Sequence, residues 1–476
     1  MSRALRADYQ QQFLLPPSLE EWVGPDHPAR FIREFVAALD LERAGFEPVE
    51  AATGRPPYAV ELLVAVWLYG YMNKLRATRV LERACQEHMG LIWLCGRLRP
   101  DHNTLWRFWR QNRPALRTLF KQVVQVAVRA DLVGLVLHAV DGTKIAARAS
   151  SRQVWRRGVL ERVVANLDAV VEEIMAQVEA AEADALPGAQ LPAGWQNAVA
   201  RREQLRTLLS TLEVEQRQYG AAGEPEARLM KTTGGAVVPA YNAQLAVDQQ
   251  SALIVAQGVV TEESDSYELV EMVAAVEATV GTPAAETVAD GGYHTPAALA
   301  AAAHRNYAVL VNESAQRAPR ADDPAHEFHS ARFTYDEPRD CCVCPRGEVL
   351  RFERARGARE HRAAVRVYRC TAFRRCPVRW QCSQDPRGRA IEIGEHHEAV
   401  VAQRVKRSDP AKRALLRQRS AIVEGPIGII KAILEFRRWT VAGLENVQTQ
   451  WALVCTGFNL RKLHRAWLAG RLALVC

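Results

Sequence analysis

The chain has 476 residues, of which 48% are apolar and 24% charged, a composition that supports a buried core and excludes collagen-like and wholly disordered proteins. A membrane span needs about 20 consecutive apolar residues, and the densest apolar stretches, Leu132–Val140 and Trp451–Leu460, are far shorter. The first ten residues carry charges and lack the apolar stretch of a secretory signal. We therefore expect a cytoplasmic protein of several domains, with no membrane partner.

Positive charge is concentrated in one part of the chain. The net charge of the whole chain is +8. Residues 340–440 hold 23 Lys or Arg against 11 Asp or Glu, which gives +12 and leaves −4 for the rest. A basic segment on a near-neutral body indicates a polyanionic partner, most often nucleic acid. The alternative is a solvated Arg-rich surface with no partner.

The N-terminal region, residues 1–130, has the pattern of an all-helical domain. Apolar residues recur every three or four positions in two predicted helices, and a third short helix follows them. Three short helices that end in one rich in arginine and aromatic residues resemble a helix-turn-helix-like unit, in which Arg107 and Arg110 would contact DNA. The alternative is a plain helical bundle with Trp106 and Trp109 in its core.

Strands and helices alternate in the centre of the chain, which predicts an α+β or α/β fold with a mixed sheet flanked by helices. The apolar run Leu132–Val140 indicates a buried strand that ends at Asp141, and Glu286–Ala289 indicates a strand that ends at Asp290. Each aspartate is followed by glycine. Further strands are expected at 241–247, 253–260 and 307–311 and a helix at 266–280, within a core of residues 131–150 and 228–325.

Residues 151–227 interrupt this core. Two apolar stripes with helical spacing, Leu160 to Val178 and Leu205 to Leu212, predict an antiparallel helical hairpin. We expect no catalytic role for the hairpin and favour contact with a partner or pairing of two protomers.

The two strand-end aspartates, Asp141 and Asp290, are candidates for a metal site. Carboxylates at the ends of neighbouring parallel strands lie close together, and they repel each other unless a cation lies between them. Carboxylate oxygens favour Mg²⁺ or Mn²⁺, and a third acid would complete a site for attack on phosphodiesters. The alternative is that each aspartate only caps the turn that follows it.

Glu424 is the candidate third acid. It lies in residues 401–476, where we expect a catalytic helix and closing helices. Arg417 and Lys431 stand seven residues before and after it, so that the three side chains would share one helix face. Pro426 removes a backbone donor, so we expect a kink or a break beside Glu424. A carboxylate for a metal ion, flanked by basic side chains for phosphates, is chemically consistent.

Six short motifs stand in order along the chain: Pro100–Leu105, Asp141–Lys144, Ala240–Gln244, Ala289–Tyr293, Val423–Lys431 and Phe436–Leu460. Together they resemble the ordered motifs of bacterial insertion-sequence transposases, which have an RNase H-like core and an Asp-Asp-Glu active site. The resemblance covers most of residues 10–465. Several motifs in the right order are far more specific than any one of them.

The resemblance implies that Asp141, Asp290 and Glu424 form a triad that binds Mg²⁺ or Mn²⁺. It also implies that Lys431 contacts DNA near the transposon end. The implied function is metal-dependent cleavage and strand transfer of an insertion sequence. The implied partners are double-stranded DNA and a second copy of the chain, or a larger assembly, in the bacterial nucleoid.

The chain departs from the family pattern beside the glutamate. An arginine is common four residues before it, where this chain has Ser420, with Arg417 and Arg419 nearby. A histidine is common where Gly425 stands. These departures affect the expected DNA contacts more than the triad. Two alternative functions remain: an RNase H-like DNA nuclease without strand transfer, and a catalytically inactive DNA-binding protein derived from a transposase.

Six of the ten cysteines fall in the stretch 341–382, within a basic insertion at residues 326–400. Clustered cysteines in a cytoplasmic protein favour a metal site over disulfides. Related transposases carry a similar insertion, and the cysteines that match best are Cys344, Cys370, Cys376 and Cys382. Four cysteines suit a structural Zn²⁺ or, alternatively, an iron–sulfur cluster. Free thiols around a small apolar cluster are the other interpretation.

Overall fold

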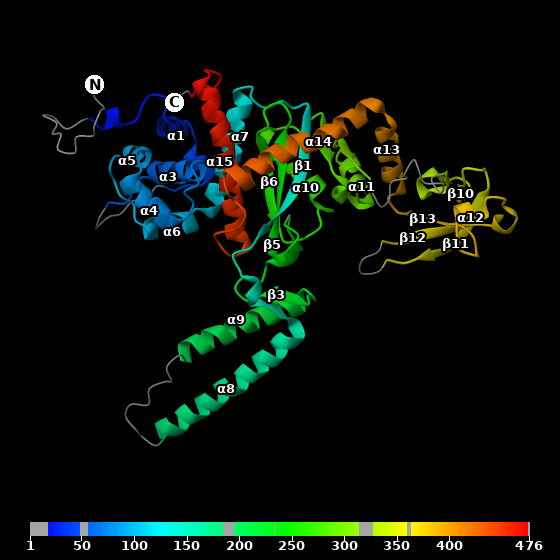
Figure 1. Cartoon of the computed structure of the whole chain (residues 1–476), viewed down its shortest axis with the longest axis horizontal. Helices are drawn as coiled ribbons and strands as arrows, with labels where there is room; N and C mark the ends of the chain where they lie inside the picture. The colour runs from blue at the N-terminus through cyan, green and yellow to red at the C-terminus, as the bar shows by residue number, and fades with distance from the viewer. Residues whose placement is uncertain are drawn as a thin grey trace, which may run out of the picture.

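The fold of the chain is seen in a computed structural model (Figure 1). A helical N-terminal part lies at one end, a mixed sheet in the centre and a small antiparallel sheet at the other end, while a long helical hairpin projects from the body. The result is a mixed α+β protein, as the sequence predicts. The structure describes residues 18–47, 56–183, 195–232, 234–313, 327–358 and 363–474.

The N-terminal part is all-helical. Proline or a capping side chain starts several of its helices: Asp101, for example, accepts a hydrogen bond from Thr104 N at the start of α6. Its helices are a short 3₁₀ turn Leu19–Trp22, α1 Pro28–Ala37, α2 Leu41–Ala44, α3 Val60–Met72, α4 Thr78–Glu87, α5 Met89–Leu94, α6 His102–Gln111 and α7 Arg113–Arg129.

The central sheet is mixed, with strand order β4-β5-β1-β7-β8 and β6 also paired to β5. β1 pairs antiparallel with β5 and parallel with β7, and β7 pairs parallel with β8. β4 and β6 pair antiparallel with β5. The strands are β1 Leu137–Ala146, β4 Arg228–Lys231, β5 Val237–Asp248, β6 Ile254–Val260, β7 Glu286–Ala289 and β8 Val309–Val311.

Strand β1 differs from the prediction at its C-terminal end. The predicted strand stops before Asp141, whereas the observed strand continues to Ala146, so Asp141 lies within the β1–β5 ladder, opposite Leu245. If Asp141 only capped a turn, the chain would turn at Gly142. Gly142 instead allows a close approach, because a Cβ there would lie 2.4 Å from Gln244 Nε2.

Long helices pack the sheet against the N-terminal part. α15 (Leu444–Leu468) contacts α3, α7 and β6, and most of its side chains are buried. The indole of Trp451 in this helix donates to the backbone oxygen of Gln244 at 3.0 Å. The buried apolar side chains of the N-terminal helices, the sheet and α15 form one continuous cluster. The remaining helices near the sheet are α10 Glu268–Val280, α11 Pro296–His304, α13 His397–Ser408 and α14 Pro410–Gly428.

The predicted helical hairpin is present. It consists of α8 (Arg157–Ala183) and α9 (Trp195–Val214), and a two-stranded sheet of β2 (Val154–Arg156) and β3 (Tyr219–Ala221) joins it to the body. Figure 1 shows both helices projecting away from the central sheet. Their mutual core is small and lies near the base; its buried members are Leu160, Val164, Leu205, Leu208, Leu212 and Ala222.

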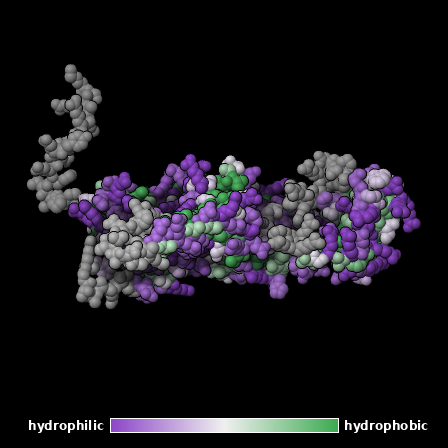
Figure 2. All heavy atoms as spheres, turned by 90° about the horizontal axis from the view of Figure 1, so that it is seen from below, coloured by the Kyte–Doolittle hydropathy of each residue, from purple (hydrophilic) through white to green (hydrophobic). Residues whose placement is uncertain are grey.

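The cysteine-rich insertion folds as a five-stranded antiparallel sheet of order β13-β12-β11-β10-β9. We call this sheet and its short helix α12 the Cys module. It has a separate small core, which includes Cys342, Leu350 and Tyr368, and much of its outer surface is hydrophilic (Figure 2). Its elements are β9 Thr334–Asp336, β10 Cys341–Val343, β11 Val349–Arg356, β12 Val365–Cys370, α12 Arg379–Cys382 and β13 Ala390–Gly394.

Helix α14 differs from the prediction near Pro426. A kink or break was expected beside Glu424, but the α-helix continues through Pro426 to Gly428. The irregular turn comes later, as a π-helix over Ile429–Ile433. Val423 and Pro426 are both buried, so packing against the sheet stabilises the helix despite the missing backbone donor.

None of the described helices is long and apolar enough to cross a membrane.

Candidate active site

The two candidate aspartates stand on neighbouring parallel strands. β1 and β7 pair in the register Leu137–Glu286, His138–Thr287 and Ala139–Val288. Two residues further along the same register, Asp141 comes beside Asp290. Adjacent strands lie about 4.8 Å apart, and the pKa of Asp141 is raised first by burial and further by the negative charge of Asp290. The structure therefore brings these two residues together, as the sequence predicts.

Asp141 is mostly buried and contacts a cation. Its side chain is 20% exposed, and its Oδ2 lies 3.0 Å from Nη1 of Arg419 on α14. Its Oδ1 accepts a hydrogen bond from the Gly142 backbone at 2.8 Å. Burial raises the pKa of Asp141 above its ordinary value, and Arg419 only partly offsets this rise.

Asp290 stands where β7 ends. Its Oδ1 accepts a hydrogen bond from the backbone of Gly292 at 2.8 Å and so caps the short turn Gly291–Tyr293. The capping interpretation thus holds for Asp290, although not for Asp141, which lies inside a strand. A cap uses one carboxylate oxygen, so it is compatible with a second role for the other.

Glu424 and its basic neighbours lie on α14, which packs against β1, β5 and β7. Glu424 and Arg417 are exposed, Arg419 contacts Asp141, and Lys431 is half-buried. Burial and Arg437 lower the pKa of Lys431, while Asp141 raises it. The face predicted from the seven-residue spacing is thus interrupted, because the π-helical turn begins between Glu424 and Lys431.

The triad is not assembled as a closed metal site. Among the described residues, no three His, Cys, Asp or Glu side chains lie close enough together to hold a metal ion. The chemistry of Asp141 and Asp290, two adjacent carboxylates with hard oxygen donors, nevertheless fits Mg²⁺ or Mn²⁺. Glu424, the third member of the predicted triad, is exposed on α14.

A polar network beside Asp141 contains a residue that the sequence analysis missed. Asp265, in the loop before α10, pairs with Lys144 Nζ at 3.0 Å and accepts hydrogen bonds from the buried amides of Asn242 and Gln244. Tyr293 donates to Gln244 Oε1. In the sequence, Asp265 stands among serines just before a helix and is typical of a helix cap. Only the alternating polar residues 242 and 244 in a predicted buried strand could have indicated a network.

The four cysteines singled out by the resemblance surround one small cavity in the Cys module. Cys344, Cys370, Cys376 and Cys382 all line this cavity of about 20 Å³, together with Arg389. Burial raises the pKa of Cys370, and it raises the pKa of Cys382 to about 11 although Arg389 opposes the rise. Cys341 and Cys342 lie on β10 and do not line the cavity.

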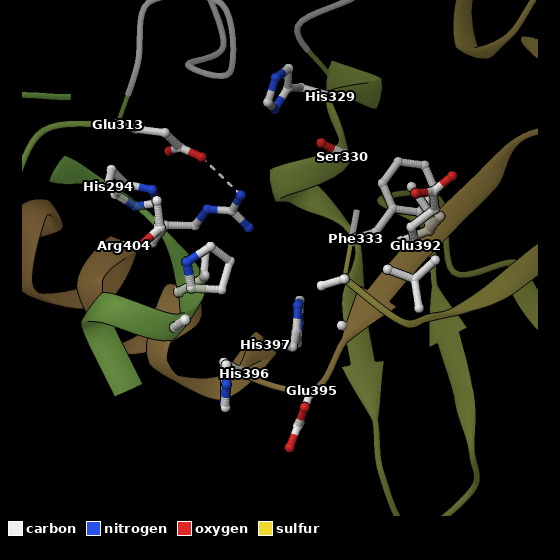
Figure 3. Close-up of a pocket in the computed structure, with 18 of the residues that line it drawn as sticks. His294, Glu313, His329, Ser330, Phe333, Glu392, Glu395, His396, His397 and Arg404 are labelled. Atoms are coloured by element: carbon white, nitrogen blue, oxygen red, sulfur yellow. Dashed lines mark hydrogen bonds and ion pairs between the residues drawn. The ribbon is translucent and has the colours of Figure 1, made fainter. Parts of the chain in front are cut away.

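A larger cavity of about 770 Å³ lies between the Cys module and the rest of the body. Figure 3 shows His294 and Glu313 of the central part on one side and Phe333 of the Cys module on the other. Arg404 of α13 pairs with Glu313 at 2.9 Å across one wall. The residues after β7, and therefore the neighbourhood of Asp290, border this cavity.

Helix α6 presents a basic and aromatic face to solvent. Arg107 and Arg110 are exposed. Trp106 is 37% exposed and stacks on Trp109, which is buried. The alternative with both tryptophans in a bundle core is therefore right for Trp109 and wrong for Trp106, because the helix turns only one of the two indoles toward α3 and α7.

Two stretches of the chain match known families. Residues 343–464 match the family described as transposase DDE domain, and residues 17–111 match the transposase domain DUF772. These two matches support an insertion-sequence DDE transposase. No curated protein matches it. The first match includes Glu424, the four cysteines and α14; Asp141 and Asp290 lie before it.

The partly buried carboxylate of Asp141 is expected to lower the stability of the folded protein in a pH-dependent way. Its raised pKa means that stability is lost as the pH rises from about 3.8, the ordinary value for Asp, through the folded pKa. Asp141→Asn is therefore expected to raise the Tm at pH 7 in a chelating buffer, and to raise it less at pH 4. Thermal unfolding at both pH values measures the difference.

A control of opposite sign is Asp385→Asn. Arg387 lowers the pKa of Asp385 to about 2, so its carboxylate stabilises the fold at pH 7 and its loss is expected to lower the Tm. An unchanged or lower Tm for Asp141→Asn at pH 7 would show that the folded state does not disfavour this carboxylate.

Proposed function

We propose that the transposase cuts and joins DNA at the ends of an insertion sequence by metal-dependent phosphoryl transfer, with Asp141, Asp290 and Glu424 as its triad. The observation that carries the proposal is the juxtaposition of Asp141 and Asp290 on parallel neighbours β1 and β7. We also propose that the central sheet is an RNase H-like core. Four strands joined by antiparallel pairs, β1, β4, β5 and β6, followed along the chain by the parallel-paired strands β7 and β8, support this assignment.

The residues of the proposed site would share the work as follows. Asp141 and Asp290 would hold the divalent ion, and Glu424 would complete the set from α14. The bound ion would activate the attacking oxygen and stabilise the leaving oxygen. Arg419 and Lys431 lie near Asp141, so their charges are placed to bind the phosphate that reacts there. Arg417 is exposed and available to the flanking DNA.

Removing a carboxylate is expected to abolish cleavage. In Mg²⁺, Asp290→Asn and Glu424→Gln should each lower the cleavage rate of a labelled duplex that carries the element's own ends by about 100-fold or more. Each variant removes a carboxylate of the proposed metal site, which stabilises the charge that develops in the transition state. Glu435→Gln is the matched control, since Glu435 is exposed and pairs with Lys74 at 2.7 Å outside the site.

The products of the same assay separate the candidate functions. Joined strands support a transposase that transfers strands, whereas nicks alone would identify a nuclease. DNA that is bound but never cut, in Mg²⁺ or Mn²⁺, would identify an inactive DNA-binding derivative. Cleavage that survives Asp290→Asn would contradict the triad.

We further propose that α6 contacts DNA and that two copies of the chain pair the two element ends. The exposed arginines of α6 are Arg107 and Arg110, and an exposed indole beside them can stack or pack on a nucleotide.

The contribution of α6 is measurable from salt dependence. Each of Arg107→Ala and Arg110→Ala should reduce the slope of log affinity against log salt by about 1, because each removes one phosphate contact. Arg43→Ala, an exposed arginine on α2 in the same helical part, should leave the slope unchanged. If all three variants have the same slope of log affinity against log salt, α6 does not contact the DNA.

We propose a structural Zn²⁺ at Cys344, Cys370, Cys376 and Cys382. Four sulfur donors match the ligand preference of zinc, and all four line one cavity, although no three of them lie close enough together to hold an ion in this structure. A bound cation would favour the thiolates and so reverse the effect of burial on the pKa of Cys370 and Cys382. The role would be to join the loops of the Cys module.

Zinc content tests this site directly. The full chain is expected to carry about one zinc ion by elemental analysis, and Cys376→Ala should lose it with a fall in Tm, since structural zinc contributes to folding. Cys341→Ala, in the same module but outside the cavity, should keep the metal. Visible absorbance with bound iron would instead identify an iron–sulfur cluster, and equal metal content in both variants would contradict the assignment.

A further inference from the structure

Asp265 is a buried acid behind the proposed active site that the mechanism above does not use. It lies in the loop between β6 and α10, and its side chain is 16% exposed. Its Oδ1 accepts from Asn242 Nδ2 at 2.7 Å and from Gln244 Nε2 at 2.6 Å. Its Oδ2 pairs with Lys144 Nζ at 3.0 Å. One carboxylate thus satisfies two buried amides and one ammonium group.

These contacts support the backbone that carries Asp141. In the β1–β5 ladder, Gln244 lies opposite Gly142, and Asn242 opposite Lys144. Successive strand residues point to opposite faces, so the Asp265 network lies on the face opposite the side chain of Asp141. Gly142 makes this packing possible, because a Cβ there would lie 2.5 Å from Asp265 Oδ1.

The same network reaches the backbone that carries Asp290. Tyr293, three residues after Asp290, is buried and donates its hydroxyl to Gln244 Oε1. A Cβ on Gly292 would lie 3.0 Å from Asp290 Oδ1 and 3.7 Å from Asp265 Oδ2. Asp265 therefore lies close to the backbone next to both aspartates, at Gly142 after Asp141 and at Gly292 after Asp290.

We propose that Asp265 is a positioning residue that fixes the separation of Asp141 and Asp290. The inference rests on the proposed function, since it assigns Asp265 to the same metal site. Two like charges on neighbouring strands repel each other, and a backbone held from behind resists that repulsion. Without the negative charge, Asn242 and Gln244 keep only a neutral and weaker acceptor, and the ammonium of Lys144 loses its charged partner.

The test uses the full chain and Mn²⁺ as the probe. Asp265→Asn is expected to weaken Mn²⁺ binding, measured by electron paramagnetic resonance, by about 10- to 100-fold, the usual effect of losing a group that orients metal ligands. DNA cleavage should fall in parallel, with unchanged DNA affinity. Glu263→Gln, an exposed acid in the same loop, should behave as wild type. Tyr293→Phe removes one hydroxyl from the same network and should weaken Mn²⁺ binding less.

The outcomes separate this inference from the proposed function. Loss of Mn²⁺ binding in Asp141→Asn with wild-type binding in both Asp265→Asn and Tyr293→Phe would overturn the positioning role alone. Unchanged binding in Asp141→Asn would overturn the metal site itself. Complete loss in Asp265→Asn at unchanged Tm would make Asp265 a ligand and not a positioning residue. If Asp265→Asn does not fold, weakened binding in a folded Tyr293→Phe supports the role, and wild-type binding overturns it.

Discussion

The parallel pairing of β1 with β7 is the constraint on which the site depends, because its register brings the carboxylates of Asp141 and Asp290 side by side. Adjacent carboxylates are unfavourable in a partly buried position, and the fold offsets this with Arg419 and with backbone donors on both strands. A sheet that served only packing would gain stability from apolar residues at both positions. The cost is retained where a cation or a phosphate is to be bound.

Buried amide side chains from two helices bond to the backbone of the edge strands β6 and β8. Asn459 of α15 bonds both the nitrogen and the oxygen of Ile254 in β6, at 3.0 and 2.8 Å. Gln403 of α13 does the same for β8, with Val311 N and Val309 O. Both helices thereby satisfy backbone groups that an edge strand would otherwise leave unpaired. The sheet is thus bonded to its helices as well as packed on them, and its strand ends are correspondingly well fixed.

The sequence predicted the elements better than their local details. The spacing of apolar residues identified the hairpin and the strands, because residues on the buried face of an element are apolar and recur with its period. It failed at Gly142 and Pro426 for a shared reason. Glycine and proline are read as breaks, but tertiary packing uses Gly142 for a close approach and holds Pro426 within a helix. Whether a tryptophan is buried, as for Trp106, likewise depends on neighbouring helices.

The part of the candidate site in which an acid follows a strand could be predicted from the sequence. The part that consists of contacts between residues far apart in the sequence could not. Asp290 was predicted from its strand end and its glycines, whereas Asp265 lies in a loop 121 residues after its partner Lys144. No local pattern encodes a contact across more than 100 residues. Such contacts follow from sheet topology, which single-sequence reasoning constrains only to a few possibilities.

Helix α14 sets the relation between metal and DNA at the proposed site. It presents Arg419 to Asp141 and leaves Glu424 in solvent. Five residues separate the two, about 7.5 Å along the helix axis, and the helix is fixed by buried Val423 and Pro426. A cation at Asp141 therefore competes with the Arg419 guanidinium. A DNA phosphate offers that guanidinium another partner, so that on the proposed function phosphate and metal binding favour each other.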